Sequence, residues 1–347
     1  MLNMAARHYT DEQAFRLERN TLFRQHWQLF CHVSQLLNPG DYVSGDIAGM
    51  AVLAIRGNDG ELRAFLNVCR HRGARLLEPG SGNCDTLRCP YHNWLYHNTG
   101  QLKHAPWFGE DSAFNVNDWP LESVSVEIWR GLVFVAINPV STLADQLAAT
   151  VAELHDVPLE SYQLWATREL VFEANWKIYT DNFVEGYHIP GIHPEFFRAI
   201  DFNNFETVAC DGLVRMTAPP RGDLFYQGRW LWMWPNWTLS LFEGGMNTSR
   251  INPLSADRTQ LIYRFYFSDV NATTDDDRRQ VLESNLEVIK EDFAICLATH
   301  ANYKAGTYKP GPLSPRHEQG VNYFQKQYLA TIQGSETDVE STVETEL

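Results

Sequence analysis

Two short cysteine–histidine motifs constrain the fold of this chain more than any other feature of its sequence. The first is Cys69-Arg70-His71, and the second, after seventeen further residues, is Cys89-Pro90-Tyr91-His92. Two Cys and two His can bind zinc, but zinc fingers and ribbons favour C-x2-C or H-x3-H halves. Here each half supplies one thiol and one imidazole. That set suits a [2Fe–2S] cluster in which one iron takes both thiolates and the other takes both imidazoles.

The residues around the two motifs favour tight loops. Glycine and proline stand at positions 73, 79, 80, 82 and 90, where they permit turns close to the cluster sulfurs. Cys84 lies outside the pattern and is interpreted as a structural thiol. The six cysteines are too scattered for a secreted disulfide scaffold, and the sequence begins without an apolar signal segment. We therefore expect a cytoplasmic protein, with a structural zinc site as the alternative use of the motifs.

A second possible metal site follows later in the chain. His188 and His193 stand five positions apart, with Pro190-Gly191 between them. The sequence predicts that His188 closes a helix begun near Asn175 and that His193 lies in the loop just after it. Both imidazoles could then bind one ion. A carboxylate would complete a two-His-one-carboxylate triad, which leaves positions open for dioxygen on Fe(II).

The two motifs together resemble those of the α subunits of Rieske-type ring-hydroxylating oxygenases, from about Trp27 to Tyr328. The resemblance implies an α+β fold. An all-β Rieske domain (27–140) would be inserted in a catalytic domain of helix-grip type (1–26 and 141–331), with an antiparallel sheet and long C-terminal helices. It also implies a head-to-tail homotrimer. The acidic segment 332–347 has no basic residue and is expected to be a flexible tail.

The resemblance assigns roles to individual residues. Cys69 and Cys89 would bind one iron of the cluster, and His71 and His92 the other. His188 and His193 would bind the mononuclear Fe(II), with Asp292 as the preferred carboxylate ligand and with Glu291 and Glu287 as competing choices. Glu185 would be the bridging carboxylate that links an iron-ligating histidine to a cluster histidine of the adjacent subunit, His92.

Composition excludes some partners and leaves others. The net charge of −15 argues against nucleic acid, and no apolar run is long enough to cross a bilayer. The sequence has no G-x-G-x-x-G run, so we expect NAD(P)H to be bound by a separate flavin and iron–sulfur reductase. The other expected partners are dioxygen and a small-molecule substrate.

The substrate is indicated by two weaker features. Members of the family that act on aromatic rings mostly carry Asp at the bridge, whereas relatives with Glu act on quaternary ammonium compounds. In addition, the stretch 225–237 is rich in aromatic residues. Trp232, Trp234 and Phe242 are predicted pocket residues, because aromatic faces attract quaternary ammonium groups. This favours oxidative hydroxylation, N-demethylation or C–N cleavage of such a compound.

Two alternatives remain open on the sequence. Hydroxylation of an aromatic ring or aromatic acid is one, and for an acid we expect a pocket arginine, with Arg215, Arg250 and Arg264 as candidates. A Rieske electron carrier without oxygenase activity is the other, although the set of His188, His193 and Asp292 argues against it.

Overall fold

The computed structural model describes residues 1–111, 113–221, 226–268 and 273–343. The chain divides into two compact units. The smaller unit is Arg24–Leu143, and the larger unit combines Met1–Phe23 with Ala144–Leu347. No helix in the described ranges is both long and apolar enough to span a bilayer.

The smaller unit is built from strands. Seven of them form a sheet in the order β1-β10-β9-β4-β3-β2-β5, and three form a separate sheet in the order β6-β7-β8. The strands are β1 Gln28–His32, β2 Asp41–Ile47, β3 Met50–Arg56, β4 Leu62–Leu66, β5 Gly80–Asn83, β6 Thr86–Arg88, β7 Leu95–His97, β8 Leu102–His104, β9 Ser123–Trp129 and β10 Leu132–Ala136. The first ligand motif follows β4, and the second joins β6 to β7.

The larger unit contains one antiparallel sheet, in the order β11-β17-β16-β15-β14-β13-β12. Its strands are β11 Tyr162–Phe172, β12 Glu206–Cys210, β13 Leu213–Thr217, β14 Tyr226–Met233, β15 Trp237–Phe242, β16 Gly245–Ser255 and β17 Arg258–Ser268. The central strand β15 is buried along its whole length, although Thr238 and Ser240 alternate with its apolar residues. The antiparallel sheet and the strand-built smaller unit confirm the expected α+β class.

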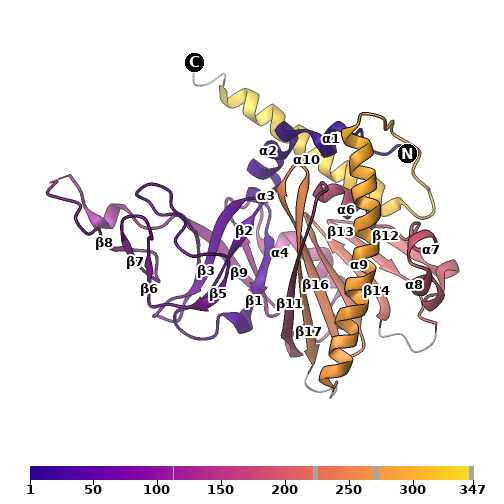
Figure 1. Ribbon diagram of the computed structural model, residues 1–347, viewed down its shortest axis with the longest axis horizontal. Helices are drawn as coiled ribbons and strands as arrows, with labels where there is room; N and C mark the ends of the chain where they lie inside the picture. The colour runs from indigo at the N-terminus through magenta and orange to yellow at the C-terminus, as the bar shows by residue number, and fades with distance from the viewer. Residues whose placement is uncertain (112, 222–225, 269–272, 344–347) are drawn as a thin grey trace. The chain divides into compact units, whose positions relative to one another are not determined.

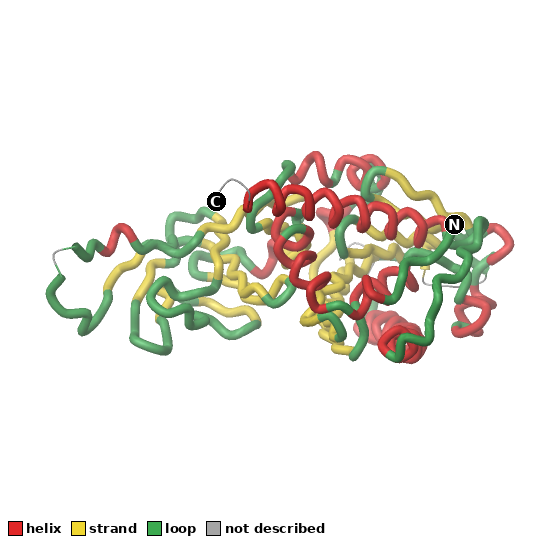
Figure 2. The backbone as a smooth tube through the Cα atoms, turned by 90° about the horizontal axis from the view of Figure 1, so that it is seen from above, coloured by secondary structure: helices red, strands yellow, loops and turns green. Residues whose placement is uncertain are grey.

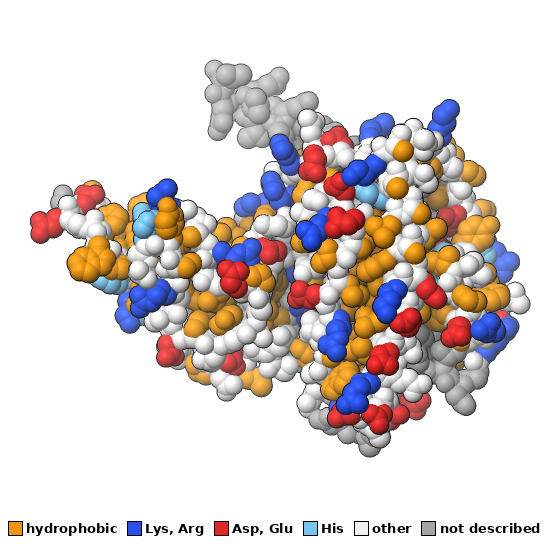
Figure 3. All heavy atoms as spheres, viewed as in Figure 1, with side chains coloured by type: hydrophobic (Ala, Val, Ile, Leu, Met, Phe, Trp, Pro, Cys, Tyr) orange, Lys and Arg blue, Asp and Glu red, His pale blue; other side chains and the backbone are white. Residues whose placement is uncertain are grey.

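Two long helices accompany this sheet. They are α9, Asp275–Lys304, and α10, Gln319–Val343. Figure 1 shows α9 running along one face of the sheet, and in Figure 2, seen from above, the same helix is viewed nearly end-on beside the strands. It begins at a capping box between Thr274 and Asp277, and its first turn is acidic, as the helix dipole favours. Acidic side chains gather at that end of the larger unit in Figure 3.

The remaining helices are short. They are α1 Arg7–Thr10, α2 Glu12–Asn20, α3 Leu22–Gln25, α4 Leu143–Gln146, α5 Ala148–Glu153, α6 Trp176–Phe183, α7 Ile189–Ile192 and α8 Pro194–Ala199, with 3-10 turns at Val33–Gln35, Val116–Asp118, Leu159–Ser161 and Phe202–Asn204. The tail expected from residue 332 begins inside α10, and its last residues, 344–347, lie outside the described ranges.

A buried ion pair ties α2 to α6 inside the larger unit. Lys177 Nζ lies 2.5 Å from Glu18 Oε1, and both side chains are almost fully buried. Trp176 Nε1 donates to the other carboxylate oxygen (2.8 Å), and the Tyr328 hydroxyl donates to Oε1 (2.7 Å). Every oxygen of this buried carboxylate is therefore matched by donors, which is the condition under which a buried charge is tolerated.

Lys177→Met is expected to lower the free energy of unfolding by about 3–5 kcal/mol, because it leaves the Glu18 carboxylate buried without its cation. The double variant Glu18→Gln/Lys177→Met removes both charges and should recover much of that loss. Urea denaturation followed by tryptophan fluorescence measures both. A single variant as stable as the wild type would show that the pair contributes no net stability.

Candidate metal centres and substrate pocket

Cys69 and Cys89 open two turns of matching geometry in the smaller unit. In each turn the cysteine N–H donates to the carbonyl five residues on, at 2.8 Å. The cysteine carbonyl accepts from the N–H four residues on, at 3.0 and 3.1 Å. That fourth residue, Gly73 or Asn93, has a positive φ of 73° or 58°. Only residues that tolerate the left-handed region fit there, so the sequence of each turn is suited to its shape.

The four predicted cluster ligands are arranged with sulfur inside and nitrogen outside. Both thiols are buried, whereas His71 is exposed and the ring centroids of His71 and His92 lie 4.6 Å apart. The Nδ1 atom of His92 is buried without a hydrogen-bond partner in the described ranges. An imidazole nitrogen left in that state fits a metal ligand, and two thiols opposite two imidazoles fit a [2Fe–2S] cluster.

One zinc ion fits the same four residues less well. Ligands of one tetrahedral zinc lie within about 4 Å of one another, given bond lengths near 2.0–2.3 Å. Among the described residues, the group of His, Cys, Asp and Glu side chains that converges to within 4.8 Å is His188, His193 and Asp292. The four residues of the smaller unit do not form such a group. This agrees with a two-iron cluster, in which each iron is held by its own pair of ligands.

Tyr96 and Trp94 support the cluster ligands, and sequence reasoning missed both. The Tyr96 hydroxyl lies 3.3 Å from Cys69 Sγ and accepts from the backbone N–H of Arg70 at 3.0 Å. When the sulfur is a metal-bound thiolate, which carries no hydrogen, the hydroxyl is the donor of this pair. Trp94 stacks on His71 with centroids 4.9 Å apart and 8° between planes. Burial raises the pKa of the Cys69 thiol, and the Tyr96 hydrogen bond acts in the opposite direction.

Tyr96→Phe is expected to lower the reduction potential of the cluster by an amount on the order of 50 mV. A hydrogen bond to a ligating sulfur stabilises the reduced, more negative state, and about 1.4 kcal/mol corresponds to 59 mV for one electron. Protein-film voltammetry measures the shift. Tyr91→Phe is the matched control, because Tyr91 lies on the turn opened by Cys89, just before the strand that carries Tyr96, and its side chain is exposed. Equal potentials in Tyr96→Phe and wild type would contradict this role for the hydroxyl.

The segment around the second histidine pair folds differently from the prediction. The helix α6 ends at Phe183, so Glu185 and His188 lie in a loop rather than on one helical face. Pro190-Gly191 do not end a helix but lie within the short helix α7, because proline is accepted in a first turn. Gly186 allows the loop to pass Phe205, whose ring would lie 2.5 Å from a Cβ at that position.

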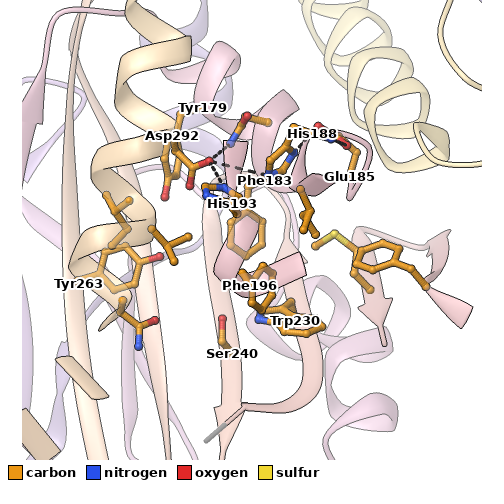
Figure 4. A pocket seen from close by; sticks show the side chains of 17 residues that line it. Tyr179, Phe183, Glu185, His188, His193, Phe196, Trp230, Ser240, Tyr263 and Asp292 are labelled. Atoms are coloured by element: carbon orange, nitrogen blue, oxygen red, sulfur yellow. Dashed lines mark hydrogen bonds and ion pairs between the residues drawn. The ribbon is translucent and has the colours of Figure 1, made fainter. Parts of the chain in front are cut away.

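His188, His193 and Asp292 nevertheless meet at one point, as Figure 4 shows. The Nε2 atom of His193 lies 3.0 Å from Asp292 Oδ1, and the Nε2 atom of His188 lies 3.8 Å from the same oxygen. The two histidines come from either side of α7, and Asp292 comes from α9. Two imidazole nitrogens and one carboxylate oxygen within 4.8 Å can hold one metal ion and leave other coordination positions open.

Each of these histidines is held from behind by a glutamate. Glu185 Oε1 lies 2.5 Å from His188 Nδ1, and Glu291 Oε2 lies 2.6 Å from His193 Nδ1. Carboxylates in this position fix the orientation and tautomer of a ligating imidazole and leave Nε2 for the metal. Glu185 also accepts from the backbone N–H groups of Tyr187 and His188, which fixes the turn.

The competing carboxylates of the prediction are thus separated in space. Asp292 faces both histidines, Glu291 contacts the far side of His193, and Glu287 pairs with Lys290 on the exposed face of α9 (2.7 Å). Asn182, which sequence reasoning missed, donates to Asp292 Oδ1 at 2.7 Å. Burial disfavours the charged imidazole of His193, but Asp292 and Glu291 outweigh it and raise the pKa of His193. The same negative field would attract a metal cation.

A pocket of about 90 Å³ adjoins the three residues. It is lined by aromatic and aliphatic side chains with a few polar groups. The lining residues are Tyr179, Asn182, Phe183, Glu185, His188, Ile189, His193, Phe196, Phe205, Met216, Trp230, Ser240, Tyr263, Asn285, Val288, Ile289 and Asp292.

The three aromatic residues predicted for the pocket do not line it. Trp232 packs against Phe324 of α10 with ring centroids 5.3 Å apart and against Trp234. Phe242 packs against Phe267. The residue that does line the pocket is Trp230, two positions earlier on the same face of β14. The alternation of tryptophans in the sequence showed which residues share one face of β14. Which of them is covered by α10 and which borders the cavity depends on tertiary packing.

The pocket lining contains no Lys or Arg, and all 28 of these residues lie in the described ranges. Of the three arginines considered for an aromatic acid, Arg215 pairs with Glu153 at 3.5 Å. Arg250 and Arg264 are buried in β16 and β17 outside the pocket. Apart from its two histidines, the lining has two charged residues, Glu185 and Asp292, and both are acidic.

Comparison with known proteins agrees with this geometry. Residues 26–120 match the Rieske [2Fe-2S] domain family, and residues 159–219 and 209–334 match the catalytic domain of the ring-hydroxylating α subunit. The carnitine monooxygenase oxygenase subunit of Escherichia coli (strain K12) is 30% identical over 88% of this chain and 85% of its own length. The chloroplastic choline monooxygenase of Atriplex hortensis is 25% identical over 91% of this chain and 75% of its own.

Solved structures extend the comparison to the fold. A quaternary ammonium Rieske monooxygenase crystallised with L-carnitine superposes with a TM-score of 0.83 at 26% identity, over 95% of both chains. Naphthalene 1,2-dioxygenase shares the fold with a TM-score of 0.80 at 21% identity, over 95% of this chain and 92% of its own. The chain therefore belongs to the Rieske non-haem iron oxygenases, as a catalytic α subunit whose family binds a [2Fe–2S] cluster and a mononuclear iron.

Proposed function

We propose that this chain oxidises a small quaternary ammonium compound in the pocket beside His188, His193 and Asp292. The observation that carries the proposal is the character of that pocket, which combines aromatic rings with acidic groups and has no basic residue in its lining. Relatives named for carnitine and choline oxidation match the chain over most of its length, which supports the same substrate class.

Aromatic side chains form the part of the lining best suited to a cation. Phe183, Phe196, Trp230 and Tyr263 border the cavity, and a quaternary ammonium group over such rings gains about 2 kcal/mol when water is excluded. Burial raises the pKa of Tyr263 to about 12, so its hydroxyl remains neutral at physiological pH. An aromatic acid, by contrast, would place its carboxylate in a pocket that offers no cationic side chain.

The residues around the metal position have separate tasks. His188, His193 and Asp292 would hold the iron, which when bound supplies the activation of dioxygen. Glu185 and Glu291 fix the two imidazoles from behind, and Asn182 positions Asp292. In the overall reaction one oxygen atom enters a C–H bond of the substrate and the other leaves as water, with two electrons and two protons taken up. Hydroxylation of a carbon attached to nitrogen leads on to C–N cleavage.

The partners follow from the same proposal. A separate NAD(P)H-dependent reductase would supply the electrons, and the active form would be a homotrimer. In that assembly Glu185 would lie between His188 and His92 of a neighbouring copy. One related structure is described as revealing inter-subunit electron transfer in a quaternary ammonium monooxygenase, which supports an assembly of this kind.

Steady-state turnover with a surrogate reductase tests the substrate class. Purified iron-loaded protein is supplied with NADH, and product is quantified for choline, carnitine and benzoate under identical conditions. We expect product from at least one trimethylammonium compound and none from benzoate. Turnover of benzoate alone would overturn the proposal.

A further inference from the structure

The pocket lining includes two polar residues besides those at the metal position and Tyr179 and Tyr263. They are Ser240 and Asn285. Ser240 lies on the buried strand β15 and is only 5% exposed, yet it lines the cavity. Its hydroxyl makes no hydrogen bond to another residue in the described ranges. Figure 4 shows the side chain rising from the strand into the space bordered by Phe196, Trp230 and Tyr263. A buried hydroxyl that faces a cavity without a protein partner is expected to bind a ligand or a water molecule.

The sheet register places this hydroxyl in a row that crosses four strands. Met216 pairs with Trp230, Trp230 with Ser240, and Ser240 with Asn247. Side chains in such a row lie side by side on one face, about 4.8 Å apart from strand to strand. Met216, Trp230 and Ser240 all line the cavity, so the sheet supplies its floor. The polar position is therefore built into the sheet rather than carried on a loop.

The helix α9 brings the second polar group to the cavity. Asn285 lines the cavity and is 6% exposed. Its Oδ1 accepts from Asn247 at 3.0 Å and its Nδ2 donates to the carbonyl of Val281 at 2.7 Å, which fixes the amide, whose nitrogen carries a second N–H. Asn285 precedes Asp292 by seven residues, which is two helical turns and about 10.5 Å along the axis. Val288 and Ile289 lie between them in the lining. One side of α9 thus presents the metal ligand, then an apolar stretch, then an amide.

We infer that Ser240, with Asn285 beside it, binds an uncharged hydrogen-bonding end of the substrate, a hydroxyl or a carbonyl. Given the proposed function, the preferred substrate is then a quaternary ammonium alcohol or a similar neutral-ended compound rather than a betaine with a carboxylate. A hydroxyl and an amide satisfy a neutral polar group. A carboxylate buried there would lose its hydration without meeting a Lys or Arg, and the two acidic residues of the lining, Glu185 and Asp292, have the same sign of charge.

A pair of nearly isosteric substrates isolates this interaction. Choline and propyltrimethylammonium differ only in that a hydroxyl replaces a methyl group. Ser240→Ala is expected to lower kcat/KM for choline about tenfold, as loss of one hydrogen bond in a buried site does, and to change it less than about twofold for propyltrimethylammonium. Calorimetric titration of the anaerobic protein should show the same difference in Kd, independently of turnover.

Thr238→Val is the matched control. Thr238 lies on the same strand and is fully buried, but its hydroxyl pairs with Ser249 at 2.6 Å outside the cavity. This variant also loses one buried hydroxyl and should leave the ratio of kcat/KM for the two substrates unchanged. A ratio that shifts equally in Thr238→Val and Ser240→Ala would mean that the effect comes from the strand and not from a contact with substrate.

The outcomes separate this inference from the proposed function. Carnitine preferred over choline in the wild type, or equal losses for choline and propyltrimethylammonium in Ser240→Ala, would overturn the role of Ser240 while leaving a quaternary ammonium oxygenase in place. Absence of turnover with every trimethylammonium compound, together with turnover of an arene, would overturn the proposed function itself.

Discussion

Replacing Asp292 by alanine is expected to lower the iron content from about three atoms per chain to about two, and to abolish product formation. The variant removes the one carboxylate oxygen that lies between the Nε2 atoms of His188 and His193. The two iron atoms of the cluster are bound by the smaller unit, so the visible absorption of a Rieske centre should persist. Plasma emission analysis of iron, beside the absorption spectrum, measures both effects in one preparation.

Glu291→Gln is the matched control for Asp292, because the two residues are adjacent on α9. Glu291 contacts Nδ1 of His193 and does not face the metal position. Loss of such a supporting carboxylate typically lowers metal affinity or activity by about 10–100-fold without removing a ligand. We therefore expect Glu291→Gln to retain iron when it is loaded at excess metal. Loss of iron from Glu291→Gln together with retention in Asp292→Ala would exchange the two assignments.

Glu185→Ala is expected to reduce product formation by about 100-fold or more while both metal sites remain filled. The variant releases Nδ1 of His188, which can then rotate or change tautomer, and in the proposed trimer it also removes the link to His92 of a neighbouring copy. Oxygen uptake and product are measured together, because dioxygen that is reduced without oxidation of the substrate is released as hydrogen peroxide. Glu185→Asp, which keeps the charge on a shorter side chain, should retain more activity than Glu185→Ala.

Normal product formation by Glu185→Ala would contradict the positioning role of this residue. Loss of iron from Glu185→Ala would show instead that Glu185 supports binding of the mononuclear iron rather than electron transfer to it. Glu195→Ala serves as the control for the general loss of a carboxylate near this site, because Glu195 lies on α8 and its side chain is 93% exposed.

The candidate metal centres could be predicted from the sequence because most of their proposed ligands stand close together along the chain. Cys69 and His71, like Cys89 and His92, lie on single turns, and the backbone of each turn closes within five residues. The pair His188 and His193 flanks one short helix, so their convergence also depends mainly on local structure. The acidic first turn of α9 likewise acts over a few residues and favours the start of the helix on which Asp292 lies.

Features that depend on tertiary packing could not be obtained in the same way. Consecutive residues on a helix point about 100° apart, so the choice between Glu291 and Asp292 depends on how α9 is rotated against the sheet. The aromatic run of β14 showed which residues share a face, but α10 covers Trp232 and leaves Trp230 at the cavity. Asn182, Tyr96 and Ser240 are recognised only when the tertiary structure shows what each one faces, which is Asp292, Cys69 and the cavity, respectively.

A single-turnover experiment under ¹⁸O₂ tests the central proposal most directly. The iron-loaded protein is reduced chemically, freed of reductant and exposed to labelled dioxygen with choline, which removes any dependence on the identity of the reductase. We predict ¹⁸O on the oxidised carbon of the product, trapped by reduction to the alcohol before the aldehyde exchanges its oxygen with water. Its amount should depend on filled mononuclear sites and fall to background in Asp292→Ala. Re-oxidation of the cluster with no labelled product from any trimethylammonium compound, while an aromatic compound is hydroxylated, would contradict it.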